Sequence, residues 1–468
     1  MSVGESNRGR LIVLVVIASA VFMSNLDLWI VNVAFVDIGT SLNASLSDVS
    51  WVLNAYAVGL AALLVPAGRL GDRIGHRQVF LAGVTIFTVA SGVCAIAPDL
   101  PVLVAARIGQ AVGAAAQLPA SLALLMAAVP EASRTNAARS WSAVGAVAAV
   151  CGPVFGGLLV TLDWRWVFVV NLPVGIAAVV IGLRVLPHPA PRSREPVPDL
   201  FGAVLLTVAV ASLTGALVEA PVWGWTSSRI AALLALAVVG TVLFVRRSMR
   251  HPHPLLELHL LRVRRFAIAN AGTVAFSAAF AIMLLSNALW CQEVWHYSPL
   301  RTGLAMAPGP LMVPFVTAWS AKLVHRIGLG PLTAVGSVLF AIGLSWRIAF
   351  AGESPDYLRD LLPSMIIGGT GVGLALSSFI AAGATALPAE RSATASGMVN
   401  SGRQIASALG VAVLITVLGT AGSVVSRYDI GWWIAVSLAL VASAIGLGLG
   451  PVRRPAVVAA RERARELA

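Results

Sequence analysis

The sequence has little charge for its length. Only 11% of its 468 residues are Asp, Glu, Lys or Arg, whereas 58% are hydrophobic. A soluble domain carries about 25% charged residues, so a soluble protein of this length is excluded. Many apolar runs reach the roughly 20 residues that a helix needs to cross a hydrocarbon core of about 30 Å. The chain is therefore predicted to be an all-α polytopic membrane protein.

Residues for disulfide, metal or catalytic chemistry are also few. The three cysteines, Cys94, Cys151 and Cys291, are scattered in apolar segments, which indicates small packing side chains rather than a disulfide framework. His251 and His253 lie in a Pro-containing stretch that is typical of a loop. The sequence has no Walker loop, no paired zinc ligands and no Ser/His/Asp arrangement. We expect neither an enzyme nor a bound metal or other cofactor.

Fourteen apolar segments are predicted to cross the membrane. Arg8 and Arg10 precede the first one, as in a signal peptide, but this segment continues to Val36 and holds polar residues. It is therefore predicted to be an uncleaved span. The spans cover roughly residues 11–36, 51–67, 79–97, 102–127, 140–160, 166–186, 200–219, 229–245, 266–290, 301–321, 331–351, 359–382, 393–418 and 430–450.

Basic residues are distributed unevenly between the two sides of these spans. With the N-terminus inside, most Lys and Arg fall on cytoplasmic loops and tails, so both termini are predicted to be cytoplasmic. The net charge of +12 comes from these loops and does not indicate a nucleic-acid partner. The bases that fall outside are Arg165, Arg229, Arg301, Arg347, Arg359 and Arg427.

A degenerate internal repeat divides the chain. Residues 322–328 align with residues 69–75, which indicates an internal duplication. Two joints, at 187–198 and 246–265, flank two spans that we interpret as an insertion. The predicted units are an N-terminal six-helix bundle in 1–186, a linker with two inserted helices in 187–265, a C-terminal six-helix bundle in 266–450 and a cytoplasmic tail in 451–468.

Two charged residues inside predicted spans give the strongest functional signals. Asp27 lies near the middle of the first span, where a carboxylate costs about 2.5–3.5 kcal/mol on insertion scales. It is expected to face an interior cavity and to carry a proton; the alternative is a structural Asp hydrogen-bonded between helices. Arg107 lies in the fourth span and needs an anionic partner. The alternative for Arg107 is a side chain that reaches the outer membrane surface.

The run of charge at residues 68–77 lies between two apolar spans and is predicted to be a tight cytoplasmic turn. Its pattern resembles the loop between the second and third helices of the major facilitator superfamily. The resemblance implies two six-helix bundles and transport by alternating access. The matching residues are Gly68, Leu70, Asp72, Arg73, Gly75 and Arg77.

Three further runs resemble the fourteen-span drug:proton antiporters of that superfamily. The first span matches their pattern at Asp27 and Asn32, although Trp29 stands where Thr is usual. Residues 163–173 match the start of the sixth span closely. Residues 391–404 contain an Ala-Ser-Gly run followed by Arg-Gln, as in the same subfamily.

The fifth span carries Gly145, Gly152, Pro153, Gly156 and Gly157. Gly152 and Gly156 are four residues apart, so they form a small-residue stripe on which another helix can pack, and Pro153 permits a bend. The pattern resembles the Gly-Pro-x-x-Gly-Gly motif found mainly in exporters of the superfamily. The alternative interpretation is ordinary helix packing.

The resemblance also implies roles for individual residues. Asp27 and Arg107 would be partners in proton coupling. Asp72 would interact with the N-terminal end of the helix that follows Arg391, and this contact would hold a cytoplasmic gate shut. The gate would comprise Gly68, Asp72, Arg73, Gly75, Arg77 and Arg391. The substrate cavity would include Trp29, Asn32, Tyr56, Gln110, Gln117 and Glu293, the last being either a second proton or cation site or a solvated loop acid.

The function implied is a proton-coupled antiporter that exports amphipathic small molecules or drugs, with protons as the coupling ion. Because Asp27 is nearly the only cavity acid and faces Arg107, neutral or monocationic substrates are predicted over dications. The alternatives are a dedicated exporter of one endogenous metabolite or antibiotic and a proton-coupled nutrient importer. We expect a monomer in the inner (cytoplasmic) membrane of a bacterium.

Overall fold

Long helices make up almost the whole structure, a computed structural model that describes residues 3–130, 133–187, 199–388 and 391–450. No strand occurs in these residues. Since a hydrocarbon core offers no water to the backbone, each spanning segment satisfies its own N–H and C=O groups within a helix. Most of the predicted linker at 187–198 and all of the predicted tail lie outside the described residues.

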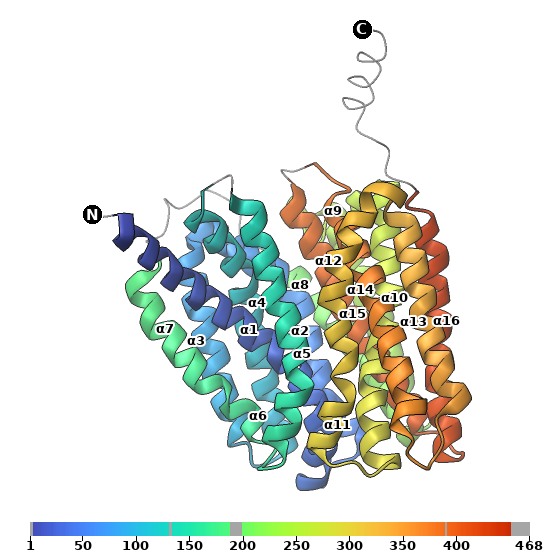
Figure 1. The fold of residues 1–468 in the computed structure, drawn as a ribbon. Coiled ribbons are helices and arrows are strands. Elements are labelled where there is room, and N and C mark those ends of the chain that lie inside the picture. The colour runs from blue at the N-terminus through green and yellow to red at the C-terminus, as the bar shows by residue number, and fades with distance from the viewer. Residues whose placement is uncertain (1–2, 131–132, 188–198, 389–390, 451–468) are drawn as a thin grey trace.

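The chain forms an N-terminal half, a central pair of helices and a C-terminal half (Figure 1). The N-terminal half contains α1 (Val3–Ser41), α2 (Leu46–Ile74), α3 (His76–Ala95), α4 (Leu100–Ala128), α5 (Arg134–Val160), α6 (Trp166–Val169) and α7 (Asn171–Val185). The central pair is α8 (Leu200–Trp223) and α9 (Ser228–Arg250), followed by the short 3₁₀ helix η2 (Leu258–Arg262). The C-terminal half contains α10 (Arg264–Leu289), the π-helical turn η3 (Trp290–Val294), α11 (Pro299–Met306), α12 (Pro308–Ile327), α13 (Leu329–Phe350), the π-helical turn η4 (Tyr357–Leu361), α14 (Leu362–Ala384), α15 (Ser392–Leu418) and α16 (Val424–Leu447).

Thirteen helices among the described residues are long and apolar enough to cross a membrane. This confirms the predicted all-α polytopic membrane class. The predicted span at 301–321 is divided between α11 and α12, which meet at Ala307. Pro308 begins α12 there, and proline cannot donate the backbone hydrogen bond that would continue α11.

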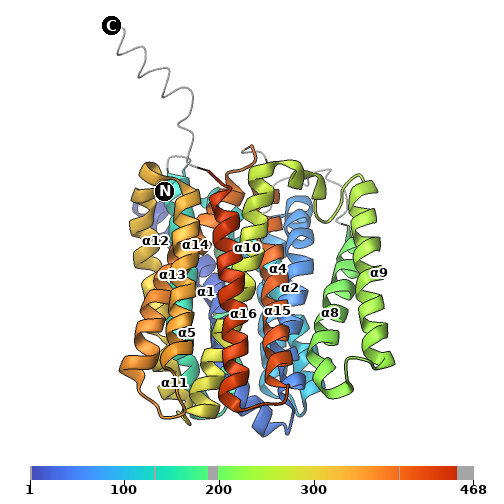
Figure 2. The same cartoon turned by 90° about the vertical axis from the view of Figure 1, so that its right-hand side faces the viewer.

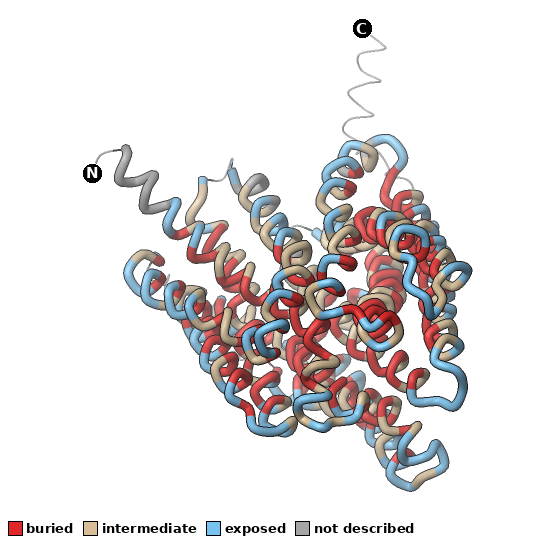
Figure 3. Tube along the Cα trace, turned by 60° about the horizontal axis from the view of Figure 1, so that its bottom comes forward, coloured by how far each residue is buried: buried red, intermediate tan, exposed pale blue. Residues whose placement is uncertain are grey.

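The surface that surrounds the helices is apolar, as a lipid-facing surface must be. On α9, Val238 and Val239 are 62% and 52% exposed. Buried residues instead follow the sides of the helices that face one another (Figure 3). Polar residues in the interior, such as Asp27 and Arg107, are therefore enclosed by helices rather than by water.

The two halves repeat the same tight turn. Gly75 joins α2 to α3 with φ +106°, and Gly328 joins α12 to α13 with φ +87°. Side chains with a Cβ rarely adopt these angles, so glycine is required at both turns. The structure thus gives the alignment of residues 69–75 with 322–328 a geometric basis.

The same repeat governs how the next helix pair packs in each half. A Cβ at Gly83 would lie 2.8 Å from the Gly113 carbonyl oxygen, and one at Gly336 would lie 2.9 Å from the Gly371 carbonyl oxygen. The α3–α4 and α13–α14 pairs therefore cross at equivalent glycines. These crossings bring polar backbone groups close together deep in each half.

The central pair lies at the edge of the molecule, beside α2 and α15 (Figure 2). Ser47 Oγ of α2 donates to the Val218 carbonyl (3.1 Å), and Thr416 Oγ1 of α15 donates to the Leu217 carbonyl (2.6 Å). The α8 helix thus contacts one helix of each half, while α9 packs against α8 and η2 and has its remaining surface exposed. The central pair does not separate the two halves.

The α1 helix begins, and the α16 helix ends, at one face of the molecule, which we call the terminal face (Figure 1). The halves are joined tightly at the opposite face. A Cβ at Gly157 of α5 would lie 2.8 Å from the Leu300 Cα of α11, and Gln292 Nε2 donates to the Val33 carbonyl (2.8 Å). Toward the terminal face, the ribbons of α4 and α5 diverge from the C-terminal half (Figure 1).

Candidate functional site

Asp27 and Arg107 form an ion pair in the interior of the N-terminal half. Asp27 lies in α1 and Arg107 in α4, and each residue is 1% exposed. Arg107 Nη1 donates to Asp27 Oδ2. The predicted pairing of two intramembrane charges is therefore present in the structure. Removal of the Asp27 carboxylate would leave the Arg107 charge buried without a counter-ion.

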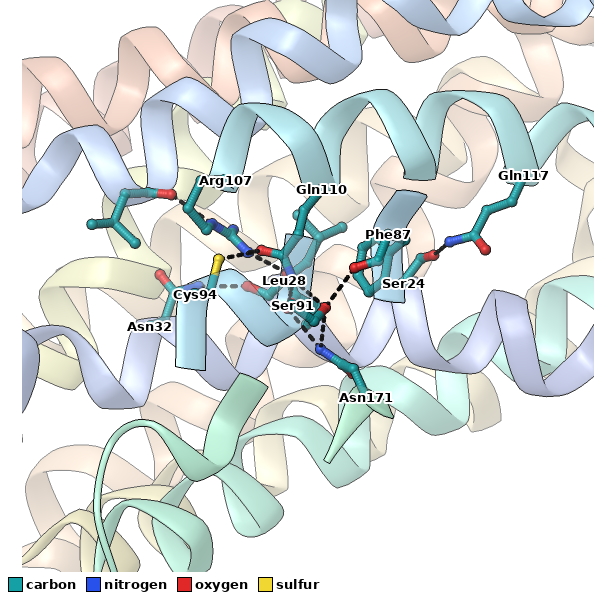
Figure 4. Close-up of polar contacts among 12 residues, drawn as sticks. Ser24, Leu28, Asn32, Phe87, Ser91, Cys94, Arg107, Gln110, Gln117 and Asn171 are labelled. Carbon is teal, nitrogen blue, oxygen red and sulfur yellow. Dashed lines mark hydrogen bonds and ion pairs between the residues drawn. The ribbon is translucent and has the colours of Figure 1, made fainter. Parts of the chain in front are cut away.

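Three further polar side chains complete the surroundings of the pair. Gln110 Nε2 and Asn171 Nδ2 each donate to Asp27 Oδ1 at 3.2 Å, and Gln110 Nε2 also donates to Ser91 Oγ at 2.8 Å. Gln110 lies in α4, Asn171 in α7 and Ser91 in α3. Figure 4 shows the three side chains meeting beside Arg107. The Asp27 carboxylate is thus held by donors from two other helices.

Arg107 has acceptors besides Asp27. Its Nε donates to the Val52 carbonyl (2.9 Å), and its Nη1 also donates to Gln110 Oε1 (2.8 Å). The Tyr56 ring lies under the guanidinium, 4.4 Å from Cζ. Arg107 would therefore keep two acceptors and an aromatic contact if its ion pair with Asp27 were weakened.

A cavity of about 260 Å³ lies between the two halves and has Arg107 in its wall. Asp27 is not among the lining residues, so it lies behind Arg107 as seen from the cavity. The walls are mainly apolar. Trp29 and Phe280 meet there edge to face with ring centroids 5.8 Å apart. The polar residues in the lining are Asn25, Asn32, Asn54, Arg107, Ser277, Asn287, Ser364, Arg403, Gln404 and Ser407.

The predicted cavity residues occupy different places. Trp29 and Asn32 line this cavity. Tyr56 and Gln110 lie behind the lining, in contact with Arg107, and Gln117 is fully buried and donates to Ser24 Oγ. A sequence assigns polar residues to a helix but does not show which side of that helix faces the cavity.

Glu293 lies away from this cavity, in η3. It borders a separate hollow with Phe35 and Val36 at the opposite face, and its Oε2 accepts a hydrogen bond from Tyr428 OH (3.0 Å). Among the described residues, no group of three His, Cys, Asp or Glu is placed to hold a metal ion. A role for Glu293 in a second proton or cation site stays a prediction.

All of the predicted gate residues except Arg391, which precedes α15, lie around the Gly75 turn at the terminal face. Asp72 Oδ1 pairs with His76 Nε2 (3.1 Å), and Arg77 Nη2 donates to the Leu183 carbonyl (2.7 Å). Gly68 packs near Pro119, and Arg73 lies in the last turn of α2. The interaction predicted between Asp72 and the helix after Arg391 stays a prediction.

A second set of contacts at the terminal face involves Glu257, which the sequence did not single out. Glu257 Oε2 lies 3.4 Å from Arg391 Nη1, and Glu257 Oε1 lies 3.6 Å from Arg69 Nη2. Arg69 belongs to α2 and Arg391 precedes α15. The segment after α9 thus links the two halves electrostatically at this face.

The glycine stripe of α5 packs on α1. A Cβ at Gly145 would lie 3.6 Å from Asn25 Oδ1, one at Gly152 would collide with Trp29 Cβ, and one at Gly156 would lie 3.2 Å from the Ile30 Cα. Pro153 lies on the other side, where its carbonyl meets Gly303 of α11. The motif therefore brings α1, with Asp27, close to α5, and α5 close to the C-terminal half.

Several site residues were not predicted. Asn171 lies in the run noted at 163–173, and its place at the start of an apolar helix was the available signal. Arg403 and Asn287 line the cavity from the C-terminal half. Arg347 was counted with the bases on the outer side of the predicted span 331–351. The structure places it in the last turn of α13, where it is 1% exposed with its Cζ 5.3 Å from the Trp432 ring centroid. A base expected at the outer surface is therefore buried.

The fold and this site define a polytopic α-helical membrane protein with a central cavity. The sequence profile of the Major Facilitator Superfamily matches residues 17–411, so the chain belongs to that superfamily. The nucleoside transporter NupG and the transporter PepTSo have the same fold, with TM-scores of 0.64 and 0.65 at 14% and 15% identity. Each comparison covers 94% of this chain, and 99% and 97% of the respective solved chains.

Three relatives are similar in sequence over most of the chain. The multidrug resistance protein Stp of Mycobacterium tuberculosis is 37% identical, over 88% of this chain and 76% of Stp. The tetracenomycin C resistance and export protein of Streptomyces glaucescens is 33% identical, over 86% of this chain and 74% of the relative. The methylenomycin A resistance protein of Streptomyces coelicolor is 31% identical, over 95% and 94%.

Proposed function

We propose that this protein exports amphipathic small molecules across the bacterial cytoplasmic membrane in exchange for protons, as a member of the fourteen-span antiporter group. The observation that carries the proposal is the position of Asp27, buried behind an arginine that lines the cavity. The names of the three relatives, which refer to multidrug resistance, antibiotic export and antibiotic resistance, support export as the direction. No cofactor is required, because the coupling ion is the proton.

The coupling would act through the position of the Arg107 side chain. With Asp27 ionised, Arg107 is attracted to the carboxylate and away from the cavity. When Asp27 takes up a proton, this attraction falls, and the Val52 carbonyl and Gln110 Oε1 still hold the guanidinium. Arg107 is then free to change its contacts with a substrate in the cavity. Proton uptake and substrate release would thus be linked through one side chain.

The internal repeat supports a proton site in the N-terminal half. Gly113 and Gly371 occupy equivalent positions, and six residues earlier on each helix lie Arg107 and Met365. In the C-terminal half, Asn287 Nδ2 lies 3.8 Å from the Met365 sulfur, where the N-terminal half has an ion pair. At these equivalent positions, only the N-terminal half therefore has an ion pair. The C-terminal half would contribute mainly to the substrate cavity.

The proton gradient is sufficient for export. A pH difference of one unit supplies about 1.4 kcal/mol per proton, and a potential of 100 mV supplies about 2.3 kcal/mol per net charge moved.

We infer that the terminal face is cytoplasmic, that the halves rock about the cavity in alternating access, and that the protein acts as a monomer. The tight contacts at the opposite face and the divergence of α4 and α5 toward the terminal face support an inward-facing state.

A dedicated exporter of one compound is the second candidate. Two of the relatives are named for a single antibiotic each, tetracenomycin C and methylenomycin A. A panel of lipophilic compounds distinguishes the candidates, because a dedicated exporter would move one compound, whereas a multidrug exporter would move several chemically different ones.

The test uses energised inside-out vesicles with a pH-sensitive dye in the lumen. The wild type is compared with Asp27→Asn and with the control Asp37→Asn, which changes a less buried aspartate of the same helix. We expect some compounds to dissipate the proton gradient in the wild type and in Asp37→Asn but not in Asp27→Asn, at equal amounts of folded protein. Equal proton movement in all three proteins would refute coupling through Asp27.

A further inference from the structure

A second arginine, Arg403, lies in the wall of the cavity. It belongs to α15 and is partly buried. Among the residues that the structure describes, its guanidinium has no ion-pair or hydrogen-bond partner, and only its carbonyl is used, by Ser407 Oγ (3.0 Å). Arg107, the other arginine of the lining, is paired with Asp27. The cavity therefore contains one compensated and one uncompensated cation.

The described residues of the cavity wall include no Asp or Glu. A cation between apolar walls at membrane depth is costly when it has no counter-ion, and such residues mark substrate or ion pathways. A ligand with an anionic group would supply the missing partner. Arginine binds a carboxylate through two parallel hydrogen bonds, which makes it well suited to this group.

The rest of the wall fits the remainder of such a ligand. Trp29, Phe280 and Phe340 offer aromatic surface for an apolar body. Asn287 Oδ1 and Ser277 Oγ are buried and unpartnered within the described part of the chain. They line the same cavity and can bind a hydroxyl or amide group.

We propose that the cavity binds amphipathic substrates through an anionic group, a carboxylate or a phenolate, which pairs with Arg403. This inference rests on the proposed export function and specifies its substrate class. It revises one part of the sequence prediction, which favoured neutral or monocationic substrates. That prediction considered the scarcity of acids near Asp27, but it did not place a second, unpaired arginine in the cavity.

The charge of the substrate decides how much net charge each transport cycle moves across the membrane. If one proton enters for each molecule that leaves, export of a monoanion moves two net charges across the membrane. Export of a neutral molecule moves one charge, and export of a monocation moves none. An inside-negative membrane potential therefore favours export of the anion most strongly.

The test uses three probes that share one apolar body: pyrenebutyrate, its methyl ester, and a pyrenebutyl trimethylammonium salt. Binding of each is measured to the full-length protein in nanodiscs of zwitterionic lipid. Arg403→Gln is compared with Arg403→Lys, which keeps the charge, and with Arg347→Gln, which removes a buried arginine that does not line the cavity. For each probe, the ratio of the dissociation constants of variant and wild type cancels partitioning of the probe into lipid.

We expect Arg403→Gln to weaken binding of pyrenebutyrate about tenfold or more and to change binding of the ester little. The variant should bind the trimethylammonium probe at least as tightly as the wild type does. Arg403→Lys should keep most of the anion affinity, and Arg347→Gln should leave all three affinities near those of the wild type. Retained ester binding shows that each variant is folded. If Arg403→Gln changes all three probes equally, or changes none, the anion site is refuted.

Transport is measured separately, so that the two proposals can fail independently. Proton-driven movement of the probes is followed in inside-out vesicles. If anion binding depends on Arg403 but the proton gradient drives no probe, the export proposal fails and the anion site stands. If the ester and the cation are exported by the wild type and by Arg403→Gln alike, and the anion by neither, export stands and the anion proposal is wrong.

Discussion

Replacement of Asp27 by Asn should destabilise the protein more than replacement of Arg107 by Gln. In Asp27→Asn, the guanidinium stays charged in the interior, because it cannot lose its proton at physiological pH. In Arg107→Gln, the remaining carboxyl can take up a proton and become neutral, and it keeps amide donors from Gln110 and Asn171. The two variants therefore break the same pair at different cost.

The magnitude follows from the contacts that remain. Removing one partner of a buried ion pair typically costs 3–5 kcal/mol. Arg107 retains the Val52 carbonyl, Gln110 Oε1 and the Tyr56 ring in Asp27→Asn, so we expect the low end, about 3 kcal/mol. For Arg107→Gln we expect about 1.5–2 kcal/mol, the lower part of the range for one hydrogen bond to a charged group, because the remaining carboxyl can become neutral.

The assay is a double-mutant cycle in the free energy of unfolding, measured in mixed micelles where unfolding is reversible and supported by thermal midpoints. The double variant Asp27→Asn/Arg107→Gln has no uncompensated charge, so it should be more stable than Asp27→Asn alone. Asp37→Asn, on the same helix, is the control for the loss of an acid. The reasoning is wrong if the two single effects add within about 0.5 kcal/mol, the value expected for independent sites, or if Asp27→Asn is no worse than the control.

Three further predictions concern packing, pH and membrane potential. Gly156→Leu should prevent α5 from packing on Ile30 and greatly reduce the yield of folded protein, whereas Gly156→Ala should be milder; equal yields for both would contradict a close contact. Asp199 caps α8 through the Gly202 N–H (2.9 Å) and pairs with Arg247 (2.8 Å). Burial raises the pKa of Asp199, but these hydrogen bonds and the Arg247 charge lower it further, so the net shift is downward. The folded state thus has the lower pKa, and the stabilisation is present above the ordinary Asp value of about 3.9 and is lost as the pH falls through the folded value. Thermal unfolding should therefore show Asp199→Asn to be less stable than the wild type at pH 7, by about 1 kcal/mol, and the difference should shrink below pH 4; a constant difference would contradict the pairing. Finally, a potassium diffusion potential of 100 mV should add about 4.6 kcal/mol to the driving force for a monoanion, 2.3 for a neutral probe and none for a monocation, at one proton per molecule; the reverse order of rates would contradict proton exchange with an anion.

Much of the site was accessible from the sequence because charge inside a membrane is rare. Asp27 and Arg107 stood out as charged residues in long apolar segments. The cost of burying Arg107 alone predicted an anionic partner, and the family resemblance indicated Asp27 as that partner. The Gly75 turn was predicted for a related reason, since glycine and basic residues between two spans indicate a tight turn at the cytoplasmic surface. In both cases a single strong physical constraint acts on a local stretch of chain.

Other features depended on which side of a helix faces the protein. Arg347 lies near the outer end of its predicted span and was counted with the outer bases, yet the buried side of α13 extends to it. Tyr56 and Gln117 were predicted in the cavity but lie behind its wall. All-round apolar helices give a weak periodic signal, so the orientation of each side chain was not determined locally.

The sequence by itself determined the class of protein and the main turns. It also identified Asp27 and Arg107 as charged residues inside membrane spans. The tertiary structure alone decided what surrounds them: that Asn171 and Gln110 hold Asp27, that Arg107 separates it from the cavity, and that Arg403 enters the same cavity without a partner. The physical reason is that the cost of a buried charge is a property of one residue in a span. Its neighbours, by contrast, come from helices that are distant in sequence and meet only through packing.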